Sequence, residues 1–338
     1  RGLAAMPRAC PAAGACAAAS VLAFALWAYK GPLYGCPPEV PLAAAVEDDS
    51  LDTVHVLYAS DAKQLPGLLT SMISVGRNLA ADERCTFHVI VAREDMELLR
   101  SLLPCFQREM ASRASAPAVE LHEVRWPPFN ITEFPIFWVN DTWGYRKPWI
   151  WSKVYPHEYL PSAPRAIWLD NDVVVDADLG PLYRMRMTRP FAAVVDQEYP
   201  HELNTGMLLY DLQRYRSEDV AGAVEAWLRQ WWAEALRPGG RFTHQAFHEQ
   251  TALSELFLHT DERRRAHLLD WRWNAVGLWN LWRMGSCVHE AHVLHFNGFP
   301  LKYWDFRFPA WTIHRWKHGL LARYVPRGCA ALEGRLRW

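Results

Sequence analysis

The chain has 338 residues, with 36 basic and 37 acidic side chains and a formal net charge of −1 at pH 7. This balance provides neither a basic field that would indicate nucleic acid nor an acidic tail that would indicate a cationic partner, so we expect no nucleic-acid partner and composition indicates no other. The length suits one large α/β domain or two ordinary ones, and it is enough to bury a substantial core.

The N-terminal region carries an uncharged run bracketed by Arg8 and Lys30. Its length fits a bilayer span, although it is rich in alanine, and a cleaved signal peptide or a transit peptide are the competing interpretations. We expect a membrane protein of the single-pass type II class, with its folded domain in the lumen of the Golgi or ER. The expected segments are a short cytosolic segment (1–8), a signal anchor (9–29), a stem or linker (30–52) and one folded domain (53–338).

Two other features depend on that location. The seven cysteines contain no Cys-X-X-Cys pair, so they predict neither a zinc site nor a redox motif. Five of them lie beyond the first apolar run, which allows two disulfides and a free thiol in an oxidising compartment, or none in the cytosol. Asn130 and Asn140 each begin an Asn-X-Thr sequence, which is an acceptor for glycans in a lumenal protein.

The folded part begins with a regular alternation of strands and helices. Apolar alternation and β-branched residues predict strands over 53–59, 86–91 and 119–124. Helical spacing of apolar residues predicts helices over 65–79 and 94–110 between them. This order is typical of a parallel sheet with flanking helices, and right-handed crossovers make it an α/β half of the nucleotide-binding type.

The second half continues the pattern after a loop rich in proline and tryptophan. A strand is expected to end at Asp170. The remaining expected elements are helices over 149–159, 218–236 and 244–258 and strands over 191–195, 207–210 and 293–296.

The stretch Ala166-Ile-Trp-Leu-Asp170-Asn-Asp172-Val-Val-Val175 places two carboxylates between apolar runs. We interpret it as a buried strand that carries its charge at its end. Side chains two apart on an extended segment point the same way, and two buried anions need a cation between them. Oxygen ligands at the carboxyl end of such a strand suit Mg²⁺ or Mn²⁺. The alternative is a polar strand end with solvated aspartates, because Asp-X-Asp alone is a weak motif.

Several motifs in a fixed order resemble the family-eight glycosyltransferases, the retaining, metal-dependent group with the glycosyltransferase A fold. The resemblance covers roughly residues 53–316. It departs from the family pattern at Tyr303, which replaces a proline, and at Thr251, which replaces a second acid. The matching motifs are Ala59-Ser-Asp61, Asp170-Asn-Asp172, Asn204-Thr-Gly206, the pair Glu249-Gln250, and His295-Phe-Asn-Gly298-Phe-Pro-Leu-Lys302-Tyr-Trp304.

The resemblance implies a role for each matching residue. The implied metal ligands for Mn²⁺ or Mg²⁺ are Asp170, Asp172 and His295. The implied contacts with a UDP-sugar are Asp61, Gly298, Lys302 and Asp170. The implied catalytic residues are Gln250, Glu249, Asn204 and Lys153, with Gln250 positioning the sugar. The chemical logic is that a departing nucleotide diphosphate gains negative charge, which a divalent ion and nearby cations must offset.

The implied reaction is transfer of a sugar, with retention, from a UDP-sugar to a glycan or glycoprotein acceptor, and the acceptor stays open because acceptor loops vary most. A non-catalytic glycan-binding relative of the fold is one alternative, and it would be expected to have lost a metal ligand. A phosphatase of the haloacid-dehalogenase type is the other. It would need a later acidic motif, which the chain lacks.

Overall fold

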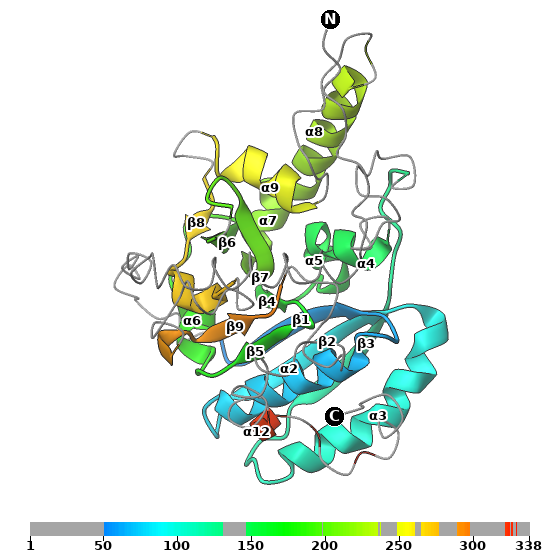
Figure 1. Cartoon of the computed structure of the whole chain (residues 1–338), viewed down its shortest axis with the longest axis vertical. Coiled ribbons are helices and arrows are strands. Elements are labelled where there is room, and N and C mark those ends of the chain that lie inside the picture. The colour runs from blue at the N-terminus through cyan, green and yellow to red at the C-terminus, as the bar shows by residue number, and fades with distance from the viewer. Residues whose placement is uncertain are drawn as a thin grey trace, which may run out of the picture.

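The structure, a computed structural model, describes residues 51–130, 147–197, 199–235, 237, 249–260, 265–276, 289–297, 322–324, 326 and 329 (Figure 1). The expected anchor, Asn140, Gly298 and Lys302 lie outside the described residues. Among the described helices, none has both the length and the apolarity needed to cross a bilayer.

The first half of the described chain confirms the expected alternation. Strand β1 pairs in parallel with β2 along eight residue pairs, and β2 pairs in parallel with β3 along six. These elements are β1 (Thr53–Ser60), α2 (Leu65–Asn78), β2 (Arg84–Val91), the 3-10 helix η1 (Arg93–Asp95), α3 (Met96–Met110) and β3 (Ala118–Glu123).

The second half adds short helices and antiparallel strands. Its first elements are α4 (Pro148–Trp151), η3 (Ser152–Val154), α5 (Pro156–Tyr159), β4 (Arg165–Leu169), β5 (Val173–Val175), α6 (Gly180–Arg184), β6 (Phe191–Val195) and β7 (Leu203–Asp211). The later ones are α7 (Leu212–Ser217), α8 (Val220–Ala235), α9 (Glu249–Phe257), β8 (His267–Leu268), η4 (Trp271–Asn274), β9 (Val293–His295) and α12 (Ala322–Tyr324).

The main sheet has the strand order β3-β2-β1-β4-β7-β6-β8. Strand β4 is parallel to β1, whereas β7 is antiparallel to both β4 and β6, and β8 is parallel to β6. The sheet is therefore mostly parallel with flanking helices, as expected. A separate two-stranded sheet joins β5 and β9 in antiparallel fashion.

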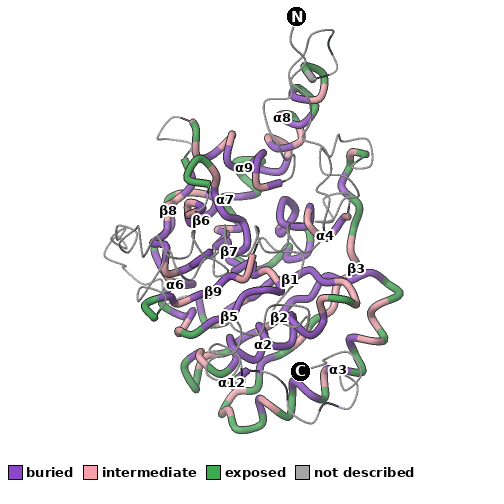
Figure 2. Tube along the Cα trace, in the orientation of Figure 1, coloured by how far each residue is buried: buried purple, intermediate pink, exposed green. Residues whose placement is uncertain are grey.

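Helices cover both faces of the main sheet, and two hydrophobic cores result (Figure 2). On β1, Val56 and Tyr58 pack into the core that includes α2 and α3, while Leu57 packs into the core that includes α4, α5, α7, α8 and α9. This division follows from the alternation of side chains along a strand.

Helix α2 is buried on nearly all sides because it contacts both β1 and β5. Its buried hydroxyls are hydrogen-bonded within the protein: Thr70 donates to the Pro66 carbonyl at 2.9 Å, and the Ser74 hydroxyl accepts from the Val175 amide at 2.9 Å. Burial of these polar groups is therefore compensated, and α2 holds the small β5–β9 sheet against the domain.

The expected helix over 149–159 is wrong as a single helix, since α4, η3 and α5 replace it. Pro156 cannot donate a backbone hydrogen bond to a continuing helix, and it begins α5 instead. A disulfide joins Cys105 of α3 to Cys329, and Cys85 is a buried free thiol in the described part of the chain.

Candidate active site

The two aspartates lie in a turn between two strands. Strand β4 ends before Asp170 and β5 begins after Asp172, and the Val173 amide donates to the Asp170 carbonyl at 3.3 Å. The expectation of a strand that ends at Asp170 is therefore confirmed, but Asp170 to Asp172 form a turn and not the extended segment that we expected. The carboxylates come together through the turn and not through strand alternation.

The side chain of Asn171 fastens this turn to the end of β1. Its Nδ2 donates to the Ala59 carbonyl at 2.7 Å and to Gln64 Oε1 at 2.8 Å. Because β1 and β4 are parallel neighbours, their carboxyl ends meet at the same edge of the sheet. The turn is thus fixed at the edge where open α/β sheets bind ligands.

Pairing between β5 and β9 brings His295 to the turn. Val173 is opposite His295 in the register, and the Phe296 amide donates to the Asp172 carbonyl at 2.8 Å. His295 Nε2 lies 3.3 Å from Asp172 Oδ1 and 3.9 Å from Asp170 Oδ2. One ligand atom from each of the three side chains lies within 4.8 Å of the other two.

This set of donors fits a divalent cation. His295 is 3% exposed and Asp172 is 7% exposed, so the carboxylate gains little compensation from water. Two carboxylate oxygens and one imidazole nitrogen suit Mn²⁺ better than Ca²⁺. His295 Nδ1 is buried with no hydrogen-bond partner among the described residues. The three residues singled out in the sequence therefore converge on one point that a metal ion can occupy.

Lys153 lies beside this point and bridges two acids. Its Nζ is 3.0 Å from Asp170 Oδ1 and 3.2 Å from Glu249 Oε1, and Lys153 is only 6% exposed. Burial favours the neutral amine, but the carboxylates of Asp170 and Glu249 act more strongly, and the pKa of Lys153 is raised above its usual value. The lysine is therefore charged at neutral pH and compensates both acids.

Glu249 and Gln250, in the first turn of α9, are joined to the site by hydrogen bonds with Thr205. The Thr205 hydroxyl donates to Glu249 Oε1 at 3.1 Å, and the Thr205 amide donates to Gln250 Oε1 at 3.1 Å. Gln250 Nε2 donates to Glu202 Oε2 at 2.8 Å. Since β7 is antiparallel to β4, the beginning of β7 lies beside the end of β4, and the Asp170 amide donates to the Gly206 carbonyl at 2.8 Å.

Asn204 is buried and engaged at both ends of its amide. Its Nδ2 donates to Asp196 Oδ2 at 2.7 Å, and its Oδ1 accepts from Asn274 Nδ2 at 2.8 Å and from the Gly206 amide at 3.0 Å. The structure therefore places Asn204 in a network that holds the backbone of β7 next to the aspartate turn. Asn204 itself lies within β7.

Asp61 lies just after β1 at the same edge of the sheet. Its Oδ1 accepts from the amides of Lys63 and Gln64 at 3.0 and 3.1 Å, and its Oδ2 is 3.6 Å from Lys147 Nζ. These contacts close the turn that leads into α2. Asp61 is also linked to the turn between β4 and β5, because Gln64 contacts both Asp61 and Asn171.

Sequence reasoning missed the supporting contacts of Asp170. The Trp168 indole donates to Asp170 Oδ1 at 2.9 Å, and Thr205 lies 3.4 Å from Lys153 Nζ. Trp168 precedes Asp170 by two positions, so strand alternation gave a usable indication of that contact. The roles of Thr205 and Glu202 depend on pairing between distant segments, and no local pattern announces them.

Gly206 provides space for the imidazole of His295, and Gly206→Ala tests this. A Cβ at position 206 would overlap the His295 ring, so we expect the substitution to displace the imidazole and weaken Mn²⁺ binding by at least about 10-fold. Manganese titration followed by electron paramagnetic resonance measures the effect. Gly76→Ala is the control, because its Cβ overlaps the flexible Met110 side chain away from the metal turn. An unchanged manganese affinity in Gly206→Ala alongside native folding would contradict the assignment of His295.

The sequence of this chain is similar to those of a known protein family. A family model described as glycosyl transferase family 8 matches residues 55–307. Among curated proteins, "Probable galacturonosyltransferase-like 3" of Arabidopsis thaliana is 22% identical in an alignment 202 positions long that covers 52% of this chain and 55% of that protein. "Probable galacturonosyltransferase-like 6" of the same organism is 21% identical over 201 residues. The chain spans about half the length of the curated relatives it matches.

Solved structures share the fold at low sequence identity. Galactosyltransferase LgtC in complex with donor and acceptor sugar analogues matches with a TM-score of 0.56 and 19% identity, over 84% of this chain and all of that one. Mouse xyloside xylosyltransferase 1 in its apo form matches with a TM-score of 0.51 and 17% identity, over 72% of this chain and 98% of that one. These likenesses confirm the glycosyltransferase A fold. Because the family model covers well over half of the sequence, the chain belongs to glycosyl transferase family 8.

Proposed function

We propose that this chain is a glycosyltransferase that moves a sugar, with retention, from a UDP-sugar to a glycan or glycoprotein acceptor, and that the reaction depends on Mn²⁺ or Mg²⁺. The observation that carries the proposal is the convergence of Asp170, Asp172 and His295 at the carboxyl edge of the sheet in a chain of this family. A non-catalytic relative would be expected to have lost one of these ligands, and none is lost.

The relatives support the substrate class. LgtC was solved with analogues of a donor and an acceptor sugar, and the mouse neighbour is named as a xylosyltransferase acting on xylosides. The curated relatives are named as probable galacturonosyltransferase-like proteins. These names agree in sugar transfer and differ in the sugar, so the donor has to be found by assay.

In the proposed site, Asp170, Asp172 and His295 hold the ion, which supplies positive charge opposite the departing diphosphate. Lys153 keeps Asp170 oriented through its ion pair and neutralises Glu249. We assign Asp61 to the nucleoside, at the end of β1. The family resemblance assigns Gly298 and Lys302 to the phosphates, where a glycine backbone and a lysine charge suit close contact with oxyanions.

Gln250 and Glu249 are assigned to the sugar side of the site, on the first turn of α9. A carboxamide is a poor nucleophile, so Gln250 positions the donor sugar and does not form a covalent intermediate. In a front-side displacement the acceptor hydroxyl bonds to the anomeric carbon as the bond to phosphate breaks, and the leaving phosphate oxygen takes the hydroxyl proton. Asn204 acts indirectly, because its side chain accepts a hydrogen bond from the Gly206 amide and so fixes that backbone.

The proposed location is the Golgi or ER lumen, with membrane attachment through residues 9–29. The disulfide between Cys105 and Cys329 supports an oxidising compartment, and Asn130 is exposed as a glycan acceptor needs to be. Protease protection in microsomes and a glycosidase-sensitive mobility shift test this placement. Digestion of the intact domain from the cytosolic side would contradict it.

The decisive experiment screens UDP-glucose, UDP-galactose, UDP-xylose and UDP-galacturonate for UDP release by the full chain. We expect one donor to be turned over with Mn²⁺ and none with EDTA, because removal of the ion leaves the charge of the departing diphosphate without the divalent cation that offsets it. Turnover that persists in EDTA contradicts the metal dependence. Saturable glycan binding without turnover of any donor would favour the non-catalytic alternative, and hydrolysis of phosphate monoesters would favour the phosphatase.

A further inference from the structure

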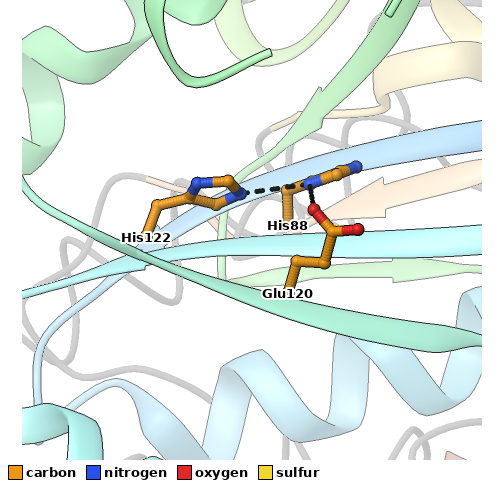
Figure 3. A group of neighbouring side chains, drawn as sticks. All are labelled: His88, Glu120 and His122. Carbon is orange, nitrogen blue, oxygen red and sulfur yellow. Dashed lines mark hydrogen bonds and ion pairs between the residues drawn. The ribbon is translucent and has the colours of Figure 1, made fainter.

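A second group of metal-binding side chains lies away from the proposed active site, on β2 and β3 (Figure 3). His88 Nδ1 is 3.1 Å from His122 Nε2 and 3.3 Å from Glu120 Oε2. In Figure 3 the two nitrogens and the carboxylate oxygen point toward one another from neighbouring strands. We propose that His88, Glu120 and His122 form a Zn²⁺ site that ties the edge strand β3 to the rest of the sheet.

Strand register explains how the three ligands meet. His88 is opposite Glu120 in the parallel pairing of β2 and β3, and His122 is opposite Ile90. Glu120 and His122 are two residues apart on one strand, so both point to the same face as His88. The arrangement therefore follows from the backbone pairing, and no side chain has to leave its place for the ligand atoms to converge.

The separations match those of a tetrahedral zinc site. Zinc bonds to nitrogen and carboxylate oxygen of about 2.0 to 2.1 Å give ligand atoms about 3.3 Å apart in a tetrahedron. His88 Nδ1 lies 3.1 Å from His122 Nε2 and 3.3 Å from Glu120 Oε2, and all three ligand atoms lie within 4.8 Å of one another. Two imidazoles and one carboxylate favour Zn²⁺ over Mg²⁺ or Ca²⁺, which prefer oxygen.

A third histidine supports His88 from the other side. His55 Nδ1 lies 3.0 Å from His88 Nε2. With Nδ1 on the metal, His88 Nε2 carries the proton and donates it to His55, which is the supporting contact that metal-bound histidines usually have.

The site is accessible to an ion and has room for a fourth ligand. The Glu120 side chain is 60% exposed, and His122 lines an open cavity of about 610 Å³ together with Arg125, Glu158 and Tyr159. A water can therefore complete the coordination. Because β3 is the terminal strand of the main sheet, a bond from β2 through the metal to β3 fixes an edge that otherwise depends on one ladder.

The proposal does not rest on the proposed function, and its test separates the two sites. The full chain carrying Asp172→Ala is dialysed against EDTA and then against Zn²⁺, and bound zinc is counted by mass spectrometry. Adding Glu120→Gln and His122→Gln to this background should remove one zinc per chain. Adding Glu123→Gln and His267→Gln instead, which changes the same residue types outside the cluster, should remove none. An equal zinc count in both variants, or no zinc bound by the Asp172→Ala protein, overturns the proposal.

Two further measurements distinguish a loss of the zinc site from a folding defect in the doubly substituted variant. His55→Asn keeps all three ligands and should lower the zinc affinity by about 10- to 100-fold in the same background. Zinc should also raise the thermal midpoint of the Asp172→Ala protein and leave that of the Glu120→Gln, His122→Gln variant unchanged. A neutral histidine ladder without an ion would give no zinc-dependent midpoint in the Asp172→Ala protein, which contradicts the site. An unchanged zinc affinity in His55→Asn would contradict the supporting contact assigned to His55.

Discussion

Replacing Asp172 by alanine should lower UDP release from the active donor by at least about 100-fold, the loss typical of a removed transition-state stabiliser. Asp172 is buried and lies 3.3 Å from His295, so its carboxylate cannot be replaced by a neighbouring water without moving the turn. Manganese affinity should fall in parallel, measured by titration on the same protein. Initial rates at saturating donor with Mn²⁺ provide the comparison with the unmodified chain.

The control for this variant is Asp82→Ala. Asp82 is exposed in the turn before β2, at the opposite end of the sheet from the metal turn. The same substitution there should leave both the rate and the manganese affinity unchanged. Activity in the Asp172→Ala variant equal to that of the Asp82→Ala control would show that the aspartate turn does not hold the catalytic ion.

Replacing Lys153 by methionine should lower the free energy of unfolding by about 3 to 5 kcal/mol, the range found when one partner of a buried ion pair is removed. Methionine keeps most of the length of the unbranched side chain and removes the positive charge that pairs with Asp170 and Glu249. Glu249 is 3% exposed, so its carboxylate has little access to water as a substitute. Urea denaturation followed by circular dichroism measures the change, provided that the slope with urea stays constant.

Two companion variants make this result specific. Adding Glu249→Gln to Lys153→Met removes one of the uncompensated charges, so part of the lost stability should return. Lys63→Met changes an exposed lysine and should have little effect. A loss in Lys153→Met no larger than that in Lys63→Met would mean that the ion pairs do not contribute to folding.

The direction in which the pKa of Lys153 is shifted also determines how the free energy of unfolding depends on pH. The pKa of Lys153 is raised in the folded protein, so its stabilising charge is fully present below the ordinary lysine pKa and is lost only as the pH rises through the folded value. Lys153 therefore adds no pH dependence near neutrality. The difference in the free energy of unfolding between the unmodified chain and Lys153→Met should therefore be the same at pH 6 and at pH 8, as measured by urea denaturation at each pH.

Local pattern predicted much of the first half of the fold. Alternation and helical spacing over residues 53–123 gave the strands and helices from β1 to β3, because each of these elements has its own apolar face. The same approach failed over 149–159, where prolines and the local backbone break the helix into short pieces. It also treated Asp170 to Asp172 as extended, because the apolar runs on either side resemble a strand, whereas the structure has a turn between β4 and β5.

What the sequence by itself determined is the set of chemical groups and the order of the motifs: an Asp-Asn-Asp sequence after a buried run, an acid and an amide on one helix, and a histidine near the end. Only the tertiary structure decided that Val173 pairs with His295, that Lys153 bridges Asp170 and Glu249, and that His88 meets Glu120 and His122. The physical reason is that backbone pairing and core packing between distant segments set these distances, and one-dimensional periodicity carries no register between strands.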